Sequence, residues 1–213
     1  MRISELRKDY QLLGLHRADL DPNPFEQFRQ WLADVLQAGV PEPNAMTLAT
    51  ADRAGKPSAR MVLLKGFDER GFIFYTNYQS RKARELSENP EAALVFYWEK
   101  LERQVCVAGR TSLLAREESA EYFNQRPRAS QLGAWASTQS EVLANRAALE
   151  EKMNQLLAEY PENSPVPLPP FWGGYVLHPD RIEFWQGRPN RLHDRFCYTR
   201  RQAGDWRIER LAP

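Results

Sequence analysis

AMTLATADRAGKPSARMVLLKGFDERGFIFYT, residues 45–76, is the stretch that decides the expected fold. It contains three short β-like runs, at 45–50, 58–65 and 72–76. Turn-forming segments that end in glycine separate them, Asp-Arg-Ala-Gly at 52–55 and Asp-Glu-Arg-Gly at 68–71. Short strands joined by tight turns favour an antiparallel barrel or sandwich.

The pattern extends on both sides of this stretch. Asn23 and Pro24 form a helix-start signal, and apolar residues follow at helical spacing up to residue 36. Further helices are expected at 80–88, 116–125 and 141–159, the last two separated by the segment 126–140. Further strands are expected at 91–98, 103–109, 171–177, 181–185, 191–199 and 206–211. This order predicts one domain over 23–213, a barrel whose last strands close the sheet after a helical excursion at about 116–160.

The composition is that of a globular protein. The 213 residues carry a net charge of +1, so no global field would gather nucleic acid or a membrane surface. The two cysteines are too few for a disulfide framework, and the start lacks the apolar block of a signal peptide, so the cytoplasm is expected. Arginine outnumbers lysine by 23 to 6, which indicates either codon bias or guanidinium groups that clamp phosphate or carboxylate.

Several common catalytic motifs are missing from the sequence. It has no G-x-G-x-x-G, no G-x-x-x-x-G-K-[ST], no G-x-S-x-G and no H-E-x-x-H. The three histidines lie far apart in the sequence, and none has a second histidine at metal-ligand spacing. We therefore expect neither a metal site nor a nucleoside-triphosphate enzyme.

The segment 182–195, IEFWQGRPNRLHDR, carries the first candidate site. If 191–199 is a strand, Arg191, His193 and Arg195 project from one face and Leu192 from the other. Trp185 on the preceding strand would add an aromatic plate beside them, a suitable wall for a flat anion. The alternative is an ordinary solvent-exposed polar face.

Three further clusters combine cations with hydroxyl groups. Arg60 and Lys65 flank an apolar run, and their spacing of five places them on opposite sides of a regular strand. Arg81 and Lys82 follow Ser80 at a helix start, where cations oppose the helix dipole unless an anion binds there. The alternatives are strand-end charges reaching solvent and a solvated basic turn.

The third of these clusters lies at 122–130. Tyr122 and Arg126 share a helical face, Pro127 should end that helix, and Ser130 could cap a new turn. Such a group could form a phosphate cup, or simply a C-terminal cation beside an N-cap. Together the clusters predict two phosphate-sized basic sites, an aromatic wall and one titratable imidazole.

The segment 182–195 resembles the signature of the pyridoxamine 5′-phosphate oxidase family, flavin enzymes that make pyridoxal 5′-phosphate. The resemblance covers nearly the whole chain, with ordered matches at 6–10, 60–65, 74–77, 80–82, 102–105, 122–130, 139–140, 171–174 and 210–213. Lys8 and Asp9 stand where the family often has Arg and Glu, and Cys106 stands where a longer side chain is common.

The resemblance implies a mainly β fold with flanking helices (α+β), the FMN-binding split β-barrel, a Greek-key-like antiparallel barrel. It implies a homodimer in which both subunits contribute to each active site. Arg60, Arg81 and Lys82 would hold the FMN phosphate, and Trp185 and Arg195 would contact the ring system. The full implied FMN set is Arg60, Met61, Val62, Leu63, Leu64, Lys65, Tyr75, Thr76, Arg81, Lys82, Gln104, Gln139, Ser140, Trp185 and Arg195.

The same resemblance implies where the substrate binds. A mobile N-terminal segment, residues 1–22, would act as a lid. The implied phosphate grip is Lys65, Tyr122, Arg126 and Ser130, with Arg191, Leu192 and His193 over the pyridine ring and Arg7 and Tyr10 on the lid. Arg191 and His193 would be the catalytic pair, and we favour a positioning role over obligatory acid–base catalysis.

The implied reaction converts pyridoxamine 5′-phosphate or pyridoxine 5′-phosphate to pyridoxal 5′-phosphate. A hydride would pass from C4′ to flavin N5, and dioxygen would then be reduced to hydrogen peroxide. The amine substrate would lose ammonia through hydrolysis of an imine. Two alternatives are a split-barrel FMN reductase or haem-degrading protein, and a non-catalytic binder of pyridoxal phosphate.

Overall fold

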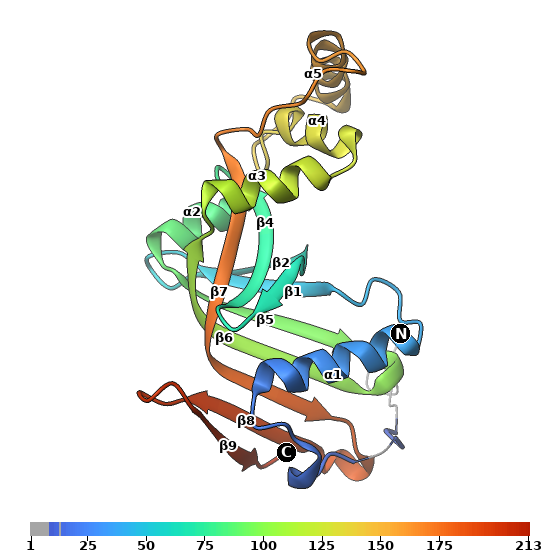
Figure 1. Ribbon diagram of the computed structural model, residues 1–213, viewed down its shortest axis with the longest axis vertical. Coiled ribbons are helices and arrows are strands. Elements are labelled where there is room, and N and C mark those ends of the chain that lie inside the picture. Colours follow the sequence, from blue (N-terminus) through green and yellow to red (C-terminus); the bar gives the residue numbers. More distant parts are fainter. Residues whose placement is uncertain (1–8, 13) are drawn as a thin grey trace.

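The computed structural model describes residues 9–12 and 14–213 (Figure 1). Its helices are α1 (Pro24–Gln37), α2 (Arg81–Glu88), α3 (Arg116–Gln125), α4 (Arg128–Ala136) and α5 (Arg146–Glu159), with short 3₁₀ turns η2 (Arg17–Asp19), η3 (Glu99–Leu101) and η4 (Pro189–Arg191). Its strands are β1 (Ala45–Ala51), β2 (Pro57–Leu63), β3 (Gly66–Asp68), β4 (Gly71–Asn77), β5 (Glu91–Trp98), β6 (Arg103–Leu113), β7 (Trp172–Gln186), β8 (Asp194–Arg200) and β9 (Trp206–Leu211).

The strands form one antiparallel sheet in the described part of the chain. Its order is β2-β1-β5-β6-β7-β4-β3, and β8 and β9 branch from β7. The predicted mainly β architecture with flanking helices is confirmed. The last strands complete the sheet because β7 pairs with β6 from Tyr175 to Gln186.

Strand β7 divides this sheet into two branches. Its first half pairs with β4 and its second half with β8. The register shifts where Gly109 of β6 faces Pro179, and a Cβ at Gly109 would lie 2.0 Å from the carbonyl oxygen of His178. Glycine therefore permits the bulge that redirects the strand. Figure 1 shows β7 running from the layer of α3 and α4 to the edge that carries β8 and β9.

Two apolar clusters hold these elements together. Helix α1 begins after the Asn23 cap, whose side chain accepts a hydrogen bond from the Phe25 amide, and it buries Phe28 completely. The Phe28 ring centroid lies 5.0 Å from both Phe72 and Phe96. A second cluster joins α3, α4 and α5 around Phe123.

Several expected element boundaries were wrong. The strand expected at 103–109 runs on to Leu113, and the run expected at 58–65 stops at Leu63. The separate strands at 171–177 and 181–185 are one strand, because the bulge at Gly109 carries pairing past Pro179. The strand expected at 191–199 starts only at Asp194. The segment 126–140 contains α4, and the helix expected from 141 starts at Arg146, where Asn145 caps it. None of the helices in the described residues has the length and apolar character needed to cross a membrane.

Candidate functional site

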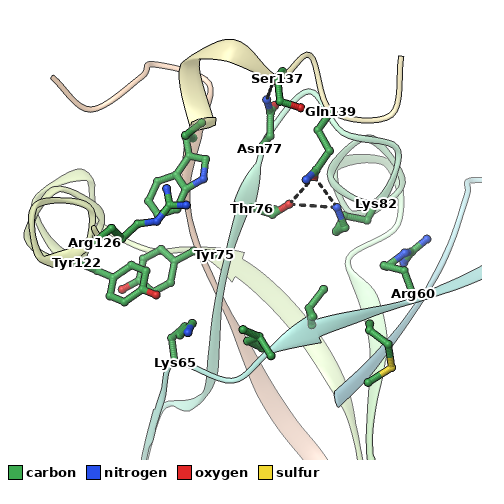
Figure 2. Close-up of a pocket in the computed structure, with 15 residues that line it drawn as sticks. Arg60, Lys65, Tyr75, Thr76, Asn77, Lys82, Tyr122, Arg126, Ser137 and Gln139 are labelled. Atoms are coloured by element: carbon green, nitrogen blue, oxygen red, sulfur yellow. Dashed lines mark hydrogen bonds between the residues drawn. The ribbon is translucent and has the colours of Figure 1, made fainter. Parts of the chain in front are cut away.

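A cavity of about 460 Å³ opens between β2, β4 and the ends of α3 and α4 (Figure 2). Arg60, Lys65, Lys82 and Arg126 all contribute to its lining, and none of the described residues that line it is acidic. The other lining residues are Met61, Val62, Leu63, Tyr75, Thr76, Asn77, Tyr122, Ala134, Ser137, Gln139 and Trp172. A cavity with four cations and no carboxylate is suited to an anionic ligand.

Arg60 and Lys65 reach this cavity because β2 ends between them. Strand β2 stops at Leu63, and the Lys65 amide then bonds to the Ile73 carbonyl instead of continuing the ladder with β1. The regular alternation that would have placed the two cations on opposite sides is therefore broken, and this expectation was wrong. Arg60 is held by the Leu48 carbonyl at 3.2 Å.

Glu85 of α2 organises the outer edge of this site. Its carboxylate accepts hydrogen bonds from Thr50 and Ser58 at 2.5 Å each, and it lies 3.3 Å from Arg60. Burial alone would raise the pKa of Glu85, but these hydrogen bonds and the Arg81 contact outweigh it and lower the pKa to about 2. Glu85 is therefore ionised at neutral pH, and its carboxylate orients Arg60 through their ion pair.

Lys82 is a buried cation without a carboxylate partner among the described residues. Its Nζ donates to Gln139 Oε1 at 2.7 Å, to Thr76 Oγ1 at 3.2 Å and to Ser80 Oγ at 3.4 Å. Burial, followed by the charge of Arg60, lowers the pKa of Lys82 to about 8. A bound anion would raise the pKa of Lys82 again, because its negative charge would compensate the positive charges of Lys82 and Arg60.

Arg126 occupies the other side of the cavity. Its Nη1 atom is buried and has no hydrogen-bond partner within the described chain. The guanidinium lies 4.7 Å from the Trp172 ring centroid, and burial lowers the pKa of Arg126. Tyr75 and Tyr122 stack beside it with their centroids 4.0 Å apart. An orphaned guanidinium donor in an aromatic wall fits a ligand that brings acceptor oxygens.

A second group of candidate residues gathers around Trp185, at the far end of β7. The His193 ring lies 4.7 Å from Trp185, and Tyr10 makes edge contacts with both rings at 5.5 and 5.6 Å. The Arg188 amide donates to His193 Nδ1 at 3.1 Å. Burial lowers the pKa of His193, and the charges of Arg191 and Arg195 add to this effect. Both effects favour the neutral form of the imidazole.

The expected Arg191–His193–Arg195 strand face does not form. Asn190 and Arg191 have φ values of 57° and 61°, which turn the chain before β8 begins. Arg191 is exposed on that turn, while Arg195 pairs with Glu183 at 2.8 Å. His193 reaches Trp185 from a loop, so turn geometry and not strand alternation brings these rings together.

The two groups lie at opposite ends of one strand. Trp172 lines the cavity and Trp185 carries the ring cluster, and both belong to β7. Thirteen residues at about 3.3 Å each place them roughly 40 Å apart along the strand. One copy of the chain therefore does not unite the two groups in a single site.

Most of the predicted site residues belong to one of these two places. The cavity contains Arg60, Met61, Val62, Leu63, Lys65, Tyr75, Thr76, Lys82, Tyr122, Arg126 and Gln139. The Trp185 end contains Tyr10, Gln104, Trp185, His193 and Arg195. Arg191 and Leu192 are exposed on the nearby turn, and Leu64, Arg81, Ser130 and Ser140 lie outside the cavity lining. Arg7 is outside the described residues.

Sequence reasoning missed five contributors to the cavity region, among them Ala134 and Ser137 of its lining. Trp172 and Asn77 lie in matched motifs but received no role, although both line the cavity. Glu85 was also missed, and its spacing of four from Arg81 is a signal for an ion pair on a helix, observed at 2.8 Å.

Comparison with known proteins identifies related sequences and structures. Residues 32–158 match the family described as pyridoxamine 5′-phosphate oxidase, and residues 172–213 match the pyridoxine 5′-phosphate oxidase C-terminal dimerisation region. A pyridoxine/pyridoxamine 5′-phosphate oxidase of Paraburkholderia phymatum is 56% identical over 99% of both chains. Another, of Salinibacter ruber, is 56% identical over 100% of this chain and 99% of its own.

Two solved structures are also similar. PhzG from Burkholderia lata, in complex with tetrahydrophenazine-1-carboxylic acid, superposes with a TM-score of 0.89 at 34% identity, covering 97% of this chain and 100% of its own. A pyridoxamine 5′-phosphate oxidase-related, FMN-binding protein of Nostoc punctiforme gives a TM-score of 0.72 at 20% identity, covering 91% of this chain and 100% of its own. The second likeness concerns the fold, and the expected split β-barrel is confirmed.

Proposed function

The chain belongs to the pyridoxamine 5′-phosphate oxidase family, and we propose that it oxidises pyridoxamine 5′-phosphate and pyridoxine 5′-phosphate to pyridoxal 5′-phosphate with FMN. Dioxygen would be reduced to hydrogen peroxide, and the amine substrate would release ammonia. The observation that carries this proposal is the cavity free of acidic lining residues, in which Lys82 and Arg126 each lack a counter-ion among the described residues.

The two unpaired cations suggest one phosphate each. Figure 2 shows Lys82 and Arg60 on one side of the cavity and Arg126 on the other. We assign the FMN phosphate to the Arg60–Lys82 side, where Thr76 adds a hydroxyl group. We assign the substrate phosphate to the Arg126 side, where Lys65 adds a second cation. This separation would set two flat rings between the two phosphates.

The proposal includes a homodimer that completes each site. Met61 of β2 is 63% exposed and Tyr97 of β5 is 52% exposed, and both flank Thr47 and Val95 on one face of the sheet. Exposed apolar side chains on a continuous sheet face are typical of a protein interface. A partner packed there could bring its own Trp185 end to this cavity, which the length of β7 prevents within one chain. The match of residues 172–213 to a dimerisation region supports this arrangement.

When bound, FMN would supply the redox chemistry, as hydride acceptor from the substrate and electron donor to dioxygen. The chain would contribute orientation. Because His193 Nδ1 accepts a hydrogen bond from the Arg188 amide, the neutral form of the ring would carry its proton on Nε2. His193 would therefore donate a hydrogen bond to the substrate, with Arg191 beside it. Both cysteines are free thiols, which is consistent with the expected cytoplasmic location.

An anaerobic visible spectrum of the purified holoprotein tests this function. Pyridoxine 5′-phosphate should bleach the flavin absorbance, and readmitted dioxygen should restore it with one equivalent of hydrogen peroxide. A flavin reduced by a nicotinamide cofactor but not by either B6 phosphate would favour a reductase. A flavin that no B6 phosphate reduces, in a protein that still binds pyridoxal phosphate, would favour a carrier.

A further inference from the structure

Glu102 links the N-terminal segment to the Trp185 end of the fold. It follows η3 in a left-handed conformation, with φ 54°, and is only 6% exposed. Its Oε2 atom accepts hydrogen bonds from the Gln11 amide at 3.0 Å and the Leu12 amide at 3.2 Å. No cation is paired with this carboxylate among the described residues, so the two backbone amides are its partners.

The backbone of Glu102 is fixed to the other side of the same junction. Its carbonyl accepts the Gly187 amide at 2.7 Å and Gln186 Nε2 at 3.2 Å. These bonds tie it to the end of β7, where Trp185 lies. Glu102 therefore joins Gln11, which lies 91 positions before it in the chain, to Gln186, which lies 84 positions after it.

Tyr10 is the side chain that this junction positions. It directly precedes the two amides bound by Glu102, and its ring contacts Trp185 and His193. The ring fits because Gly187 has no side chain, since a Cβ there would lie 2.7 Å from Tyr10 and 3.0 Å from the Glu102 Cβ. The carboxylate holds the backbone on one side while the glycine leaves room on the other.

The geometry points to Glu102 as a positioning residue for substrate binding, acting through Tyr10. This inference rests on the proposed function, in which His193 contacts the substrate, and on the resemblance, which implies that Tyr10 does so too. Glu102 itself touches only the chain. Its removal would free Tyr10 from the aromatic cluster, so it should weaken substrate binding and leave the chemical step and FMN binding nearly unchanged.

Anaerobic stopped-flow reduction with pyridoxine 5′-phosphate separates these effects. In Glu102→Ala, the half-saturating substrate concentration should rise about ten-fold, with less than a two-fold change in the limiting rate. Glu102→Gln should restore wild-type behaviour, because one amide oxygen can accept both hydrogen bonds. Gly187→Ala should reproduce the weakened binding by displacing the Tyr10 ring, and Glu151→Ala on the exposed face of α5 is the matched control.

A double-mutant cycle distinguishes positioning from a general structural role. In a Tyr10→Ala background, Glu102→Ala should cause no further loss of substrate affinity, whereas independent effects would add and overturn the inference. Hydrogen exchange over residues 9–12 provides a readout that needs no activity, and Glu102→Ala should accelerate it. Faster exchange with unchanged substrate affinity would also overturn the inference. If the wild-type protein has no oxidase activity but Glu102→Ala still accelerates exchange over residues 9–12, the proposed function alone is rejected.

Discussion

The cavity and the Trp185 end differ in how their side chains are held. Arg60 and Lys82 project from a strand and a helix, and side-chain hydrogen bonds fix them from several directions. His193 and Tyr10 lie on loops, where a backbone amide and ring contacts position them. The comparison indicates a rigid half, which we propose binds phosphate, and a half whose geometry depends on a few backbone contacts. Variants in the two halves should therefore fail in different ways.

Lys82→Met should have the largest effect, on the rigid half. It removes the cation assigned to the FMN phosphate while preserving most of the side-chain volume, at a cost of about 3 kcal/mol of binding, or roughly 150-fold in FMN affinity. Fluorescence titration of the apoprotein measures this change. Lys152→Met on the exposed part of α5 is the control, and equal losses in the two variants would refute the assignment.

Arg126→Met should separate substrate binding from stability within the same cavity. Substrate affinity should fall about 30-fold, because the phosphate loses its charged donor, while FMN affinity stays within two-fold. The apoprotein should become more stable by about 1 kcal/mol, because a half-buried guanidinium whose Nη1 has no hydrogen-bond partner is replaced by an apolar side chain. Denaturant unfolding of the apoprotein checks the second expectation against Arg146→Met, an exposed arginine. Destabilisation would mean that Arg126 supports the fold.

Arg191→Ala probes the half formed by loops. Since Arg191 is exposed on its turn, the melting temperature and FMN affinity should not change. The limiting rate of flavin reduction by pyridoxine 5′-phosphate should fall about 20-fold, because substrate orientation is lost. An unchanged anaerobic bleaching rate would remove Arg191 from the active site.

The smallest expected effect is a pH dependence of FMN binding that is due to Lys82. Its pKa of about 8 lies below the ordinary value, so the cation is present at pH 7 and is lost as the pH rises through 8. The dissociation constant of FMN from the apoprotein should therefore rise about ten-fold between pH 7 and pH 9. Riboflavin, which has no phosphate, should show no such dependence, and Lys82→Met should abolish it. A similar slope for riboflavin would assign the titration to another group.

Local signals in the sequence were sufficient for most of the fold. Asn23 and Pro24 correctly marked the start of α1, and glycine-ended turns marked β1, β2 and β4, whereas the short strand β3 was not expected. The strand expected at 191–199 was too long because alternation alone does not reveal positive φ values at Asn190 and Arg191. The continuous β7 was missed because the bulge that accommodates Pro179 depends on its partner strand.

The candidate site was predictable in composition but not in arrangement. The clusters correctly grouped Tyr122 with Arg126, since a helical turn brings them to one cavity wall. No local signal in the sequence indicated that Lys65 and Arg60 line the same cavity. Their placement depends on the end of β2 at Leu63 and on the hydrogen bond from Lys65 to β4. The contact between Tyr10 and His193 joins residues at the two ends of the chain, and no spacing rule reaches that far.

The length of β7 has a consequence for complementation between two variant subunits. If each catalytic centre takes its cavity from one subunit and its Trp185 end from the other, two inactive variants can complement each other. A mixed dimer of Lys82→Met and Arg191→Ala subunits would concentrate both lesions in one centre and leave the other intact. Random exchange of equal amounts would then restore about a quarter of the wild-type centres. A strand too long to serve one centre would then make every centre the joint product of two chains.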